Sequence, residues 1–169
     1  MDNNVVEGIA AILEESQTAV LVFNFRGVGG SQGSHDRGVG EVDDALAALQ
    51  YLANHPSVDR NRLGMAGYSF GAMITLNAAA RDQRIRALAL VGCPTRSLEN
   101  PAVQQLAQPI LFVHGDHDQV VQQEAFTSLV PLLRQPAEVE VLPGGDHFLL
   151  GYEDAVGGSV AEFFQRTLA

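Results

Sequence analysis

The most informative segment of this chain is Leu63-Gly64-Met65-Ala66-Gly67-Tyr68-Ser69-Phe70-Gly71. Its apolar first half predicts a short buried strand, and the alanine-rich run from Gly71 to Ala80 predicts a helix directly after it. The G-x-S-x-G sequence between them predicts a sharp turn with Ser69 at its apex, at the positive end of the helix. We expect side-chain bulk in place of Gly67 or Gly71 to clash where strand and helix cross.

Outward from this turn, apolar runs of strand length alternate with segments of helical period. This alternation is typical of an α/β fold, and it predicts a mostly parallel sheet of about five strands flanked by helices. Residues 1–169 form one predicted domain, without internal repeats. The expected strands are 19–25, 63–67, 86–91, 110–113 and 138–142, and the last alternates as an edge strand does. The expected helices are 5–13, 41–54, 71–80, 123–133 and 160–168.

Charge and composition exclude several classes of function. The formal net charge is −10, so the protein repels phosphate backbones and anionic lipids, and we expect no nucleic-acid or membrane partner. All basic residues are arginine, which excludes a Schiff-base lysine and the lysine of a P-loop. The single cysteine, Cys93, allows no intrachain disulfide and no cysteine-built zinc site. We expect no cofactor. A polar N-terminus and the lack of a long apolar run predict a cytoplasmic protein.

A serine hydroxyl becomes a nucleophile only with a base in hydrogen-bond reach and an acid that orients the base. The turn resembles that of the α/β-hydrolases, and this resemblance implies that the partners follow in the order serine, acid, histidine. Of the five histidines, His147 alone follows both Ser69 and the acids of the Gly115–Asp118 segment, and it lies in a loop after the last strand. Asp116 and Asp118 both follow the strand that ends at Val113. Spacing excludes neither, and we favour Asp118.

Other residues compete for these roles. Gly29-Gly30-Ser31-Gln32-Gly33 matches the serine motif too, but a polar loop follows it instead of an apolar helix. The cluster His114, Asp116, His117 and Asp118 is an alternative metal site, although no fourth ligand of suitable spacing is evident. His147 could be a solvated loop histidine. Asp146 is interpreted as a loop cap and Cys93 as a buried small residue.

With these residues placed, the chain resembles the α/β-hydrolase superfamily, and within it the small dienelactone-hydrolase-like and esterase-like members. The resemblance spans nearly the whole chain, through segments 24–31, 40–44, 67–71, 114–118 and 145–148. It implies that Asp118, the last residue of a Gly-acid-x-Asp string, is the acid, and that the Phe70 N–H donates to the oxyanion. It also implies a small ester substrate cleaved through an acyl-serine, with thioesters or lactones as alternatives. Tyr68 and Phe148 are the expected walls of a cleft without a cap domain.

The chain departs from the family at its start, where the usual leading strands and the loop with the second oxyanion donor are missing. We therefore expect the segment from Val20 to Phe25 to pair directly with the strand from Leu63 to Ala66, or a second chain to complete the sheet in a homodimer. The same departure leaves an alternative function open: a non-catalytic or weakly active interaction domain derived from hydrolases.

Overall fold

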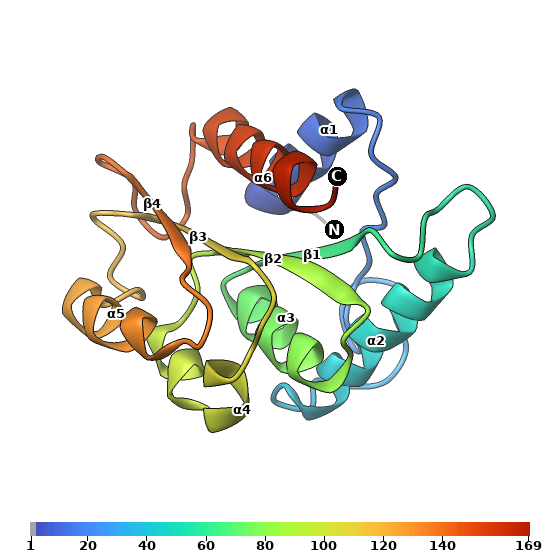
Figure 1. Cartoon of the computed structure of the whole chain (residues 1–169), viewed down its shortest axis with the longest axis horizontal. Helices are drawn as coiled ribbons and strands as arrows, with labels where there is room; N and C mark the ends of the chain where they lie inside the picture. The colour runs from blue at the N-terminus through green and yellow to red at the C-terminus, as the bar shows by residue number, and fades with distance from the viewer. Residues whose placement is uncertain (1–2) are drawn as a thin grey trace.

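Four parallel strands form the sheet of the computed structural model, which describes residues 3–169 (Figure 1). The strands lie in the order β1-β2-β3-β4, so sequence order and spatial order coincide. Their bounds are Leu63–Tyr68, Ile85–Val91, Ile110–Gly115 and Glu138–Leu142. Because all strands run the same way, their carboxyl ends meet at one edge of the sheet, and the loops that follow them lie side by side there.

Helices cover both faces of the sheet. Helix α1 (Asn4–Glu15) and helix α6 (Glu153–Thr167) lie side by side on one face, at the top of Figure 1. The other face is covered by α2 (Val39–Ala53), α3 (Phe70–Arg81), α4 (Pro101–Gln104) and α5 (Gln123–Leu129). Short 3-10 helices occupy Thr95–Glu99 and Val130–Leu132. The predicted α/β class, with a parallel sheet flanked by helices, is confirmed.

Two apolar layers arise from the alternation of side chains along the buried strands. On β2, Ala87, Ala89 and Val91 point to the layer shared with α1 and α6. Leu88 and Leu90 point to the opposite layer, shared with α2 and α3. All five are fully buried, which is why this strand reads as a continuous apolar run.

The expected strand at residues 19–25 is wrong. This segment has no strand partner among the described residues, so the sheet has four strands and the direct pairing with β1 does not form. Phe23 and Phe25 nevertheless pack against the core, with their rings edge to face at 5.1 Å. The segment is only partly buried, and Val22 is 44% exposed, so the expectation of a buried strand is wrong for burial as well. An apolar run forms a strand only where a neighbouring backbone offers free N–H and C=O groups. Pairing with a second chain remains a prediction.

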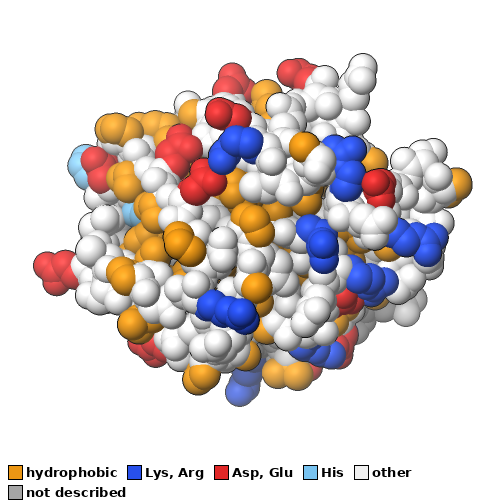
Figure 2. Space-filling view, viewed as in Figure 1, with side chains coloured by type: hydrophobic (Ala, Val, Ile, Leu, Met, Phe, Trp, Pro, Cys, Tyr) orange, Lys and Arg blue, Asp and Glu red, His pale blue; other side chains and the backbone are white. Residues whose placement is uncertain are grey.

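The surface carries its charge unevenly. On the face of the molecule drawn in Figure 2, arginine side chains gather on the side where α2 lies. Hydrophobic side chains are scattered between charged ones. Arg60, Arg84 and Arg86 line a shallow cavity of 280 Å³ there. They lie at the amino ends of β1 and β2, opposite the strand ends that lead to Ser69. Within residues 3–169, no helix combines the length and the apolar character needed to cross a bilayer.

Candidate active site

Ser69 lies at the turn between β1 and α3, where its backbone is strained. Its φ of 51° and ψ of −113° fall in a region that non-glycine residues rarely adopt. The Ser69 N–H donates to the carbonyl of Val91 on β2 at 2.8 Å, which fixes the turn to the sheet. The residue is the N-cap of α3, so its side chain stands at the positive end of the helix.

The two glycines of the motif differ in what they do. A Cβ on Gly67 would lie 2.3 Å from the Gly71 carbonyl oxygen and 2.6 Å from the Thr75 hydroxyl, so only glycine fits. A Cβ on Gly71 would meet no atom within 4 Å outside its own helix. The expected clash is therefore present at Gly67 and wrong at Gly71, because the side-chain direction at Gly71 points into open space.

Ser69, His147 and Asp118 form one hydrogen-bonded chain. The Ser69 Oγ lies 2.9 Å from His147 Nε2, and His147 Nδ1 lies 2.9 Å from Asp118 Oδ2. Because a carboxylate only accepts, the hydrogen is on Nδ1, and Nε2 is left to accept the serine proton. The Asp118 side chain is 1% exposed and the His147 side chain 16% exposed. The structure thus brings the three predicted residues together from three different loops.

The two candidate acids have separate partners. Asp118 directs Oδ2 to His147, and its Oδ1 accepts the N–H groups of Val120 and Val121 at 2.7 and 3.0 Å. Asp116 instead accepts the Gly144 N–H at 2.7 Å, in the loop that precedes His147. Geometry therefore resolves what sequence spacing left open: Asp118 contacts the imidazole and Asp116 braces the loop.

Tyr68 and Gly92 hold the His147 ring. The Tyr68 hydroxyl donates to the His147 carbonyl at 2.8 Å, and the two rings stack with centroids 5.4 Å apart. Burial raises the pKa of Tyr68, and the nearby charges of Asp118 and Asp146 add to this. Tyr68, expected as a cleft wall, thus also supports the histidine. Gly92 was missed: its φ is 54°, and a Cβ there would lie 3.1 Å from His147 Cε1. The glycine directly after the apolar run of β2 is the sequence signal that could have predicted this close approach to the imidazole.

The loop around His147 is closed by Asp146. Its Oδ1 accepts the N–H groups of Phe148 and Leu149 at 2.9 and 3.1 Å, which confirms the interpretation as a loop cap. Leu149 is buried at 1% exposure and anchors the loop, while Phe148 is 64% exposed beside the imidazole. The predicted wall residue Phe148 therefore stands at the open rim of the site.

The Phe70 N–H is free to bind an oxyanion. Phe70 is the first residue of α3, and the carbonyls of a helix cannot reach the N–H groups of its first turn. Among residues 3–169, no acceptor is hydrogen bonded to this N–H. Its position next to Ser69 places a donor of the helix end beside the serine hydroxyl.

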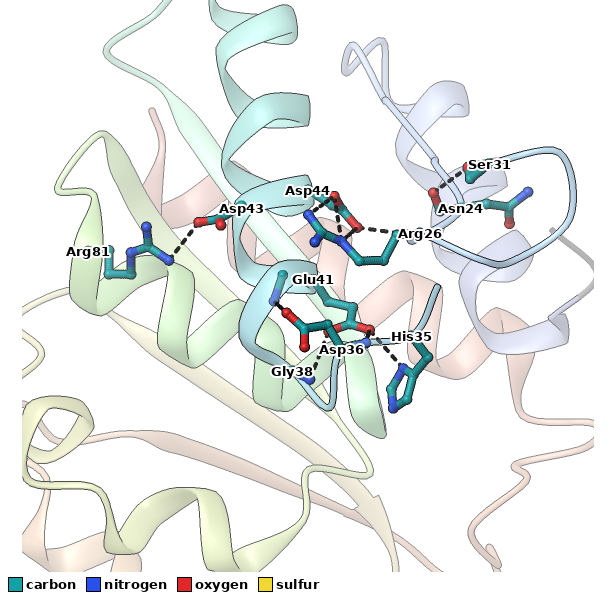
Figure 3. Close-up of polar contacts among 11 residues, drawn as sticks. Asn24, Arg26, Ser31, His35, Asp36, Gly38, Glu41, Asp43, Asp44 and Arg81 are labelled. Atoms are coloured by element: carbon teal, nitrogen blue, oxygen red, sulfur yellow. Dashed lines mark hydrogen bonds and ion pairs between the residues drawn. The ribbon is translucent and has the colours of Figure 1, made fainter. Parts of the chain in front are cut away.

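The competing residues are engaged elsewhere. The Ser31 hydroxyl donates to the Asn24 carbonyl at 2.8 Å (Figure 3). His114 is buried and pairs with Gln123 at 2.9 Å. In the part of the chain that the structure describes, no group of three His, Cys, Asp or Glu side chains could hold a metal ion. Cys93 is buried as predicted, and burial raises the pKa of its thiol to about 12, so a thiolate nucleophile is disfavoured.

The Ser69 cluster lies apart from two cavities of the surface. A cavity of 330 Å³ lies between the segment 21–26 and helix α2, and it contains none of Ser69, Asp118 and His147. The cavity of 280 Å³ lies at the far end of the sheet.

Comparisons with known proteins point the same way. Residues 31–162 match the family model described as the dienelactone hydrolase family. An uncharacterized protein from Rickettsia prowazekii is 36% identical over 157 residues, which cover 88% of this chain and 65% of the relative. The chain therefore spans less than two thirds of the length of this relative.

Two solved structures combine high similarity of fold and sequence. An alpha-beta serine hydrolase homologue from Coxiella burnetii is 37% identical, with a TM-score of 0.82 over 100% of this chain and 78% of that one. A serine hydrolase without lid from Xanthomonas campestris is 33% identical, with a TM-score of 0.87 over 99% and 75% of the two chains. The sequence match over most of the chain, the parallel sheet and these neighbours together show that the chain belongs to the dienelactone hydrolase family and is an α/β hydrolase.

Proposed function

We propose that this protein is a serine hydrolase that cleaves small carboxylic esters through an acyl-serine intermediate. The observation that carries the proposal is the hydrogen-bonded chain from Ser69 through His147 to Asp118, with both links at 2.9 Å. Membership of the dienelactone hydrolase family supports hydrolysis as the reaction class. The ester substrate and the role of each residue are the parts that experiment has to test.

In the first half of the proposed reaction, the Ser69 Oγ attacks the ester carbonyl carbon while His147 Nε2 takes the hydroxyl proton. The Phe70 N–H donates to the carbonyl oxygen as it becomes an oxyanion. Collapse of the tetrahedral intermediate breaks the bond to the alcohol, which leaves with the proton now on His147. An acyl-Ser69 ester remains.

In the second half, a water molecule attacks the acyl carbon and gives its proton to His147 Nε2. The Ser69 Oγ then leaves, takes this proton back, and the carboxylic acid is released. Asp118 stays ionised throughout and accepts from Nδ1–H, so it stabilises the imidazolium that forms in each half. Its two bonds from Val120 and Val121 hold the carboxylate in this orientation.

We assign small esters because the rim of the site is open. Phe148 is 64% exposed next to His147, and Tyr68 continues the apolar surface beneath the imidazole. Between β2 and β3 the chain forms only a 3-10 helix and the four-residue helix α4, which is too little to build a cap over Ser69. An open apolar rim accommodates a short acyl chain without enclosing it.

A fluorophosphonate probe and a panel of p-nitrophenyl esters of increasing chain length test the proposal. We expect the wild type to be labelled and to hydrolyse short esters fastest, and the Ser69→Ala variant to do neither. The Ser31→Ala variant is the matched control, because it removes the serine of the other G-x-S-x-G sequence, at residues 29–33. Equal labelling of wild type and Ser69→Ala would end the proposal in favour of a non-catalytic domain. Thioester and lactone substrates in the same panel decide which acyl class is preferred.

A further inference from the structure

Glu41 is a buried carboxylate outside the proposed catalytic residues. It lies in the first turn of α2 and is 0% exposed. Its Oε2 accepts the Gly38 N–H at 2.8 Å, and its Oε1 accepts the Asp36 N–H at 2.7 Å (Figure 3). A capping-box glutamate needs only the bond from the N-cap residue, and such residues are rarely fully buried. Glu41 therefore does more than cap its helix.

The additional partner is His35. Its Nδ1 lies 2.7 Å from Glu41 Oε1, and Figure 3 shows the imidazole turned toward the carboxylate. Burial alone would raise the pKa of Glu41, yet the N–H groups of Asp36 and Gly38 and the nearby His35 hold it below its ordinary value. An ionised carboxylate in this position fixes the turn from His35 to Gly38 to the start of α2.

The turn leads to the Ser69 site through Phe70. The His35 ring lies 5.3 Å from the Phe70 ring, and Phe25 contacts Phe70 edge to face at 5.8 Å. A Cβ on Gly38 would lie 3.0 Å from the Met73 side chain on α3, so this turn packs closely on the helix. The turn that Glu41 organises therefore contacts α3 through His35 and Gly38, and the N–H of Phe70 is the proposed oxyanion donor.

We infer that Glu41 is a positioning residue of the Ser69 site, which acts through His35 on Phe70 and so aligns the oxyanion donor. The inference rests on the proposed function of Ser69. The carboxylate contacts no reacting atom; it orients His35, and the His35 ring and the turn around it fix the start of α3. Loss of this support lowers kcat and leaves KM nearly unchanged, because the affected bond forms only in the transition state.

The test compares Glu41→Gln with Asp43→Asn. Both remove one charge near the start of α2, but Asp43 is exposed and pairs with Arg81 at 2.9 Å. We expect Glu41→Gln to lower kcat per fluorophosphonate-labelled serine by about tenfold at unchanged KM. This loss is smaller than that caused by removing an oxyanion donor completely, because the Phe70 N–H is misaligned and not absent. Asp43→Asn should stay within about twofold of wild type. Normalisation to labelled serine separates this effect from a loss of folded protein.

His35 variants test the route. His35→Leu removes the donor to Glu41 and should reproduce the loss of kcat, whereas His35→Gln keeps an N–H donor and should restore most of it. Wild-type turnover per labelled serine in Glu41→Gln and His35→Leu would overturn the inference and assign Glu41 to fold stability alone.

A readout without turnover keeps the inference separate from the proposed function. We expect the backbone amide resonance of Phe70 to shift in Glu41→Gln and His35→Leu but not in Asp43→Asn. If the wild type hydrolyses no ester, the proposed function fails. The Phe70 amide resonance still shows whether Glu41 and His35 position the start of α3. An unchanged Phe70 amide in both variants would overturn the inference, whatever the activity.

Discussion

The chain contains the pattern G-x-S-x-G twice, and the two copies have opposite surroundings. Ser69 sits between a strand and a helix with a strained backbone, and its hydroxyl reaches His147. Ser31 sits in a loop, and its hydroxyl reaches only the Asn24 carbonyl. The comparison shows that the pattern alone does not bring a serine to a histidine. A sharp turn at the carboxyl edge of the sheet does, because there the histidine and aspartate of later loops can approach the serine.

Exchanging each serine for alanine gives the largest expected contrast. Ser69→Ala should lower kcat by about 10⁶-fold, since the nucleophile itself is lost. Ser31→Ala should leave kcat within about twofold, because it removes one hydrogen bond in a loop. Initial rates with a short p-nitrophenyl ester measure both. A large loss in Ser31→Ala at intact folding would contradict the distinction between the two motifs.

The loop after β3, which carries Asp116 and Asp118, offers the next contrast. Asp118→Asn should lower kcat by about 10⁴-fold, because the amide no longer holds the Nδ1–H tautomer of His147. Asp116→Asn should cost much less, since it only weakens the bond from the Gly144 N–H. Steady-state kinetics of the two variants measure the difference. Similar losses in both would mean that the loop rearranges and that both carboxylates serve the histidine.

The two glycines of the functional motif allow a test of the turn. Gly67→Ala should lower the free energy of unfolding by about 3 kcal/mol, because its Cβ overlaps the Gly71 carbonyl. Gly71→Ala should be neutral or stabilising by about 0.5 kcal/mol, since its Cβ meets open space and alanine favours the helix. Urea unfolding followed by circular dichroism measures both. Equal destabilisation by the two substitutions would show that the space next to Gly71 is not open.

Removal of the Tyr68 hydroxyl tests the support of His147. Tyr68→Phe deletes the bond to the His147 carbonyl and should lower kcat/KM by about fivefold, which corresponds to about 1 kcal/mol for one hydrogen bond. Tyr152→Phe is the control, because its hydroxyl donates to the Pro143 carbonyl in the same loop at 2.7 Å. If both variants lose the same activity, the effect belongs to the loop as a whole and not to the imidazole.

The smallest expected effect is on thermal stability, and it concerns the segment that leads into the Ser31 copy of the pattern. Asp44 accepts three side-chain bonds and one backbone bond from Arg26, and the side-chain bonds from Arg26 hold the pKa of Asp44 below its ordinary value of 3.8. A lowered pKa means that this pair stabilises the fold above about pH 4 and loses its effect as the pH falls further.

The Asp44→Asn variant should therefore melt a few degrees lower than wild type at pH 7, and the gap should close toward about pH 3. Thermal unfolding over this pH range measures it, while turnover at pH 7 should change little. A gap that stays constant down to pH 3 would show that Asp44 contributes through packing and not through its charge.

Much of the fold was predictable from local patterns. Helical periodicity predicted α1 and α6, and continuous apolar runs predicted β2 and β3. The run at residues 19–25 has equal apolar character but lies outside the sheet. Strand formation depends on a neighbouring backbone far away in sequence, which composition does not encode. In the same way, the helical pattern from residue 41 predicts α2 but contains no sign that Glu41 is buried and contacts His35.

From the sequence alone, the α/β class and the turn at Ser69 follow from side-chain periodicity and backbone preferences within short segments, and the order of serine, acid and histidine follows from the resemblance to α/β-hydrolases. The folded chain adds that Asp118 and not Asp116 contacts His147, that Gly92 makes room for the imidazole, and that His35 contacts both Glu41 and Phe70. These relations depend on distances of a few ångströms between side chains, and the packing of strands, helices and loops sets those distances, which no local sequence pattern contains.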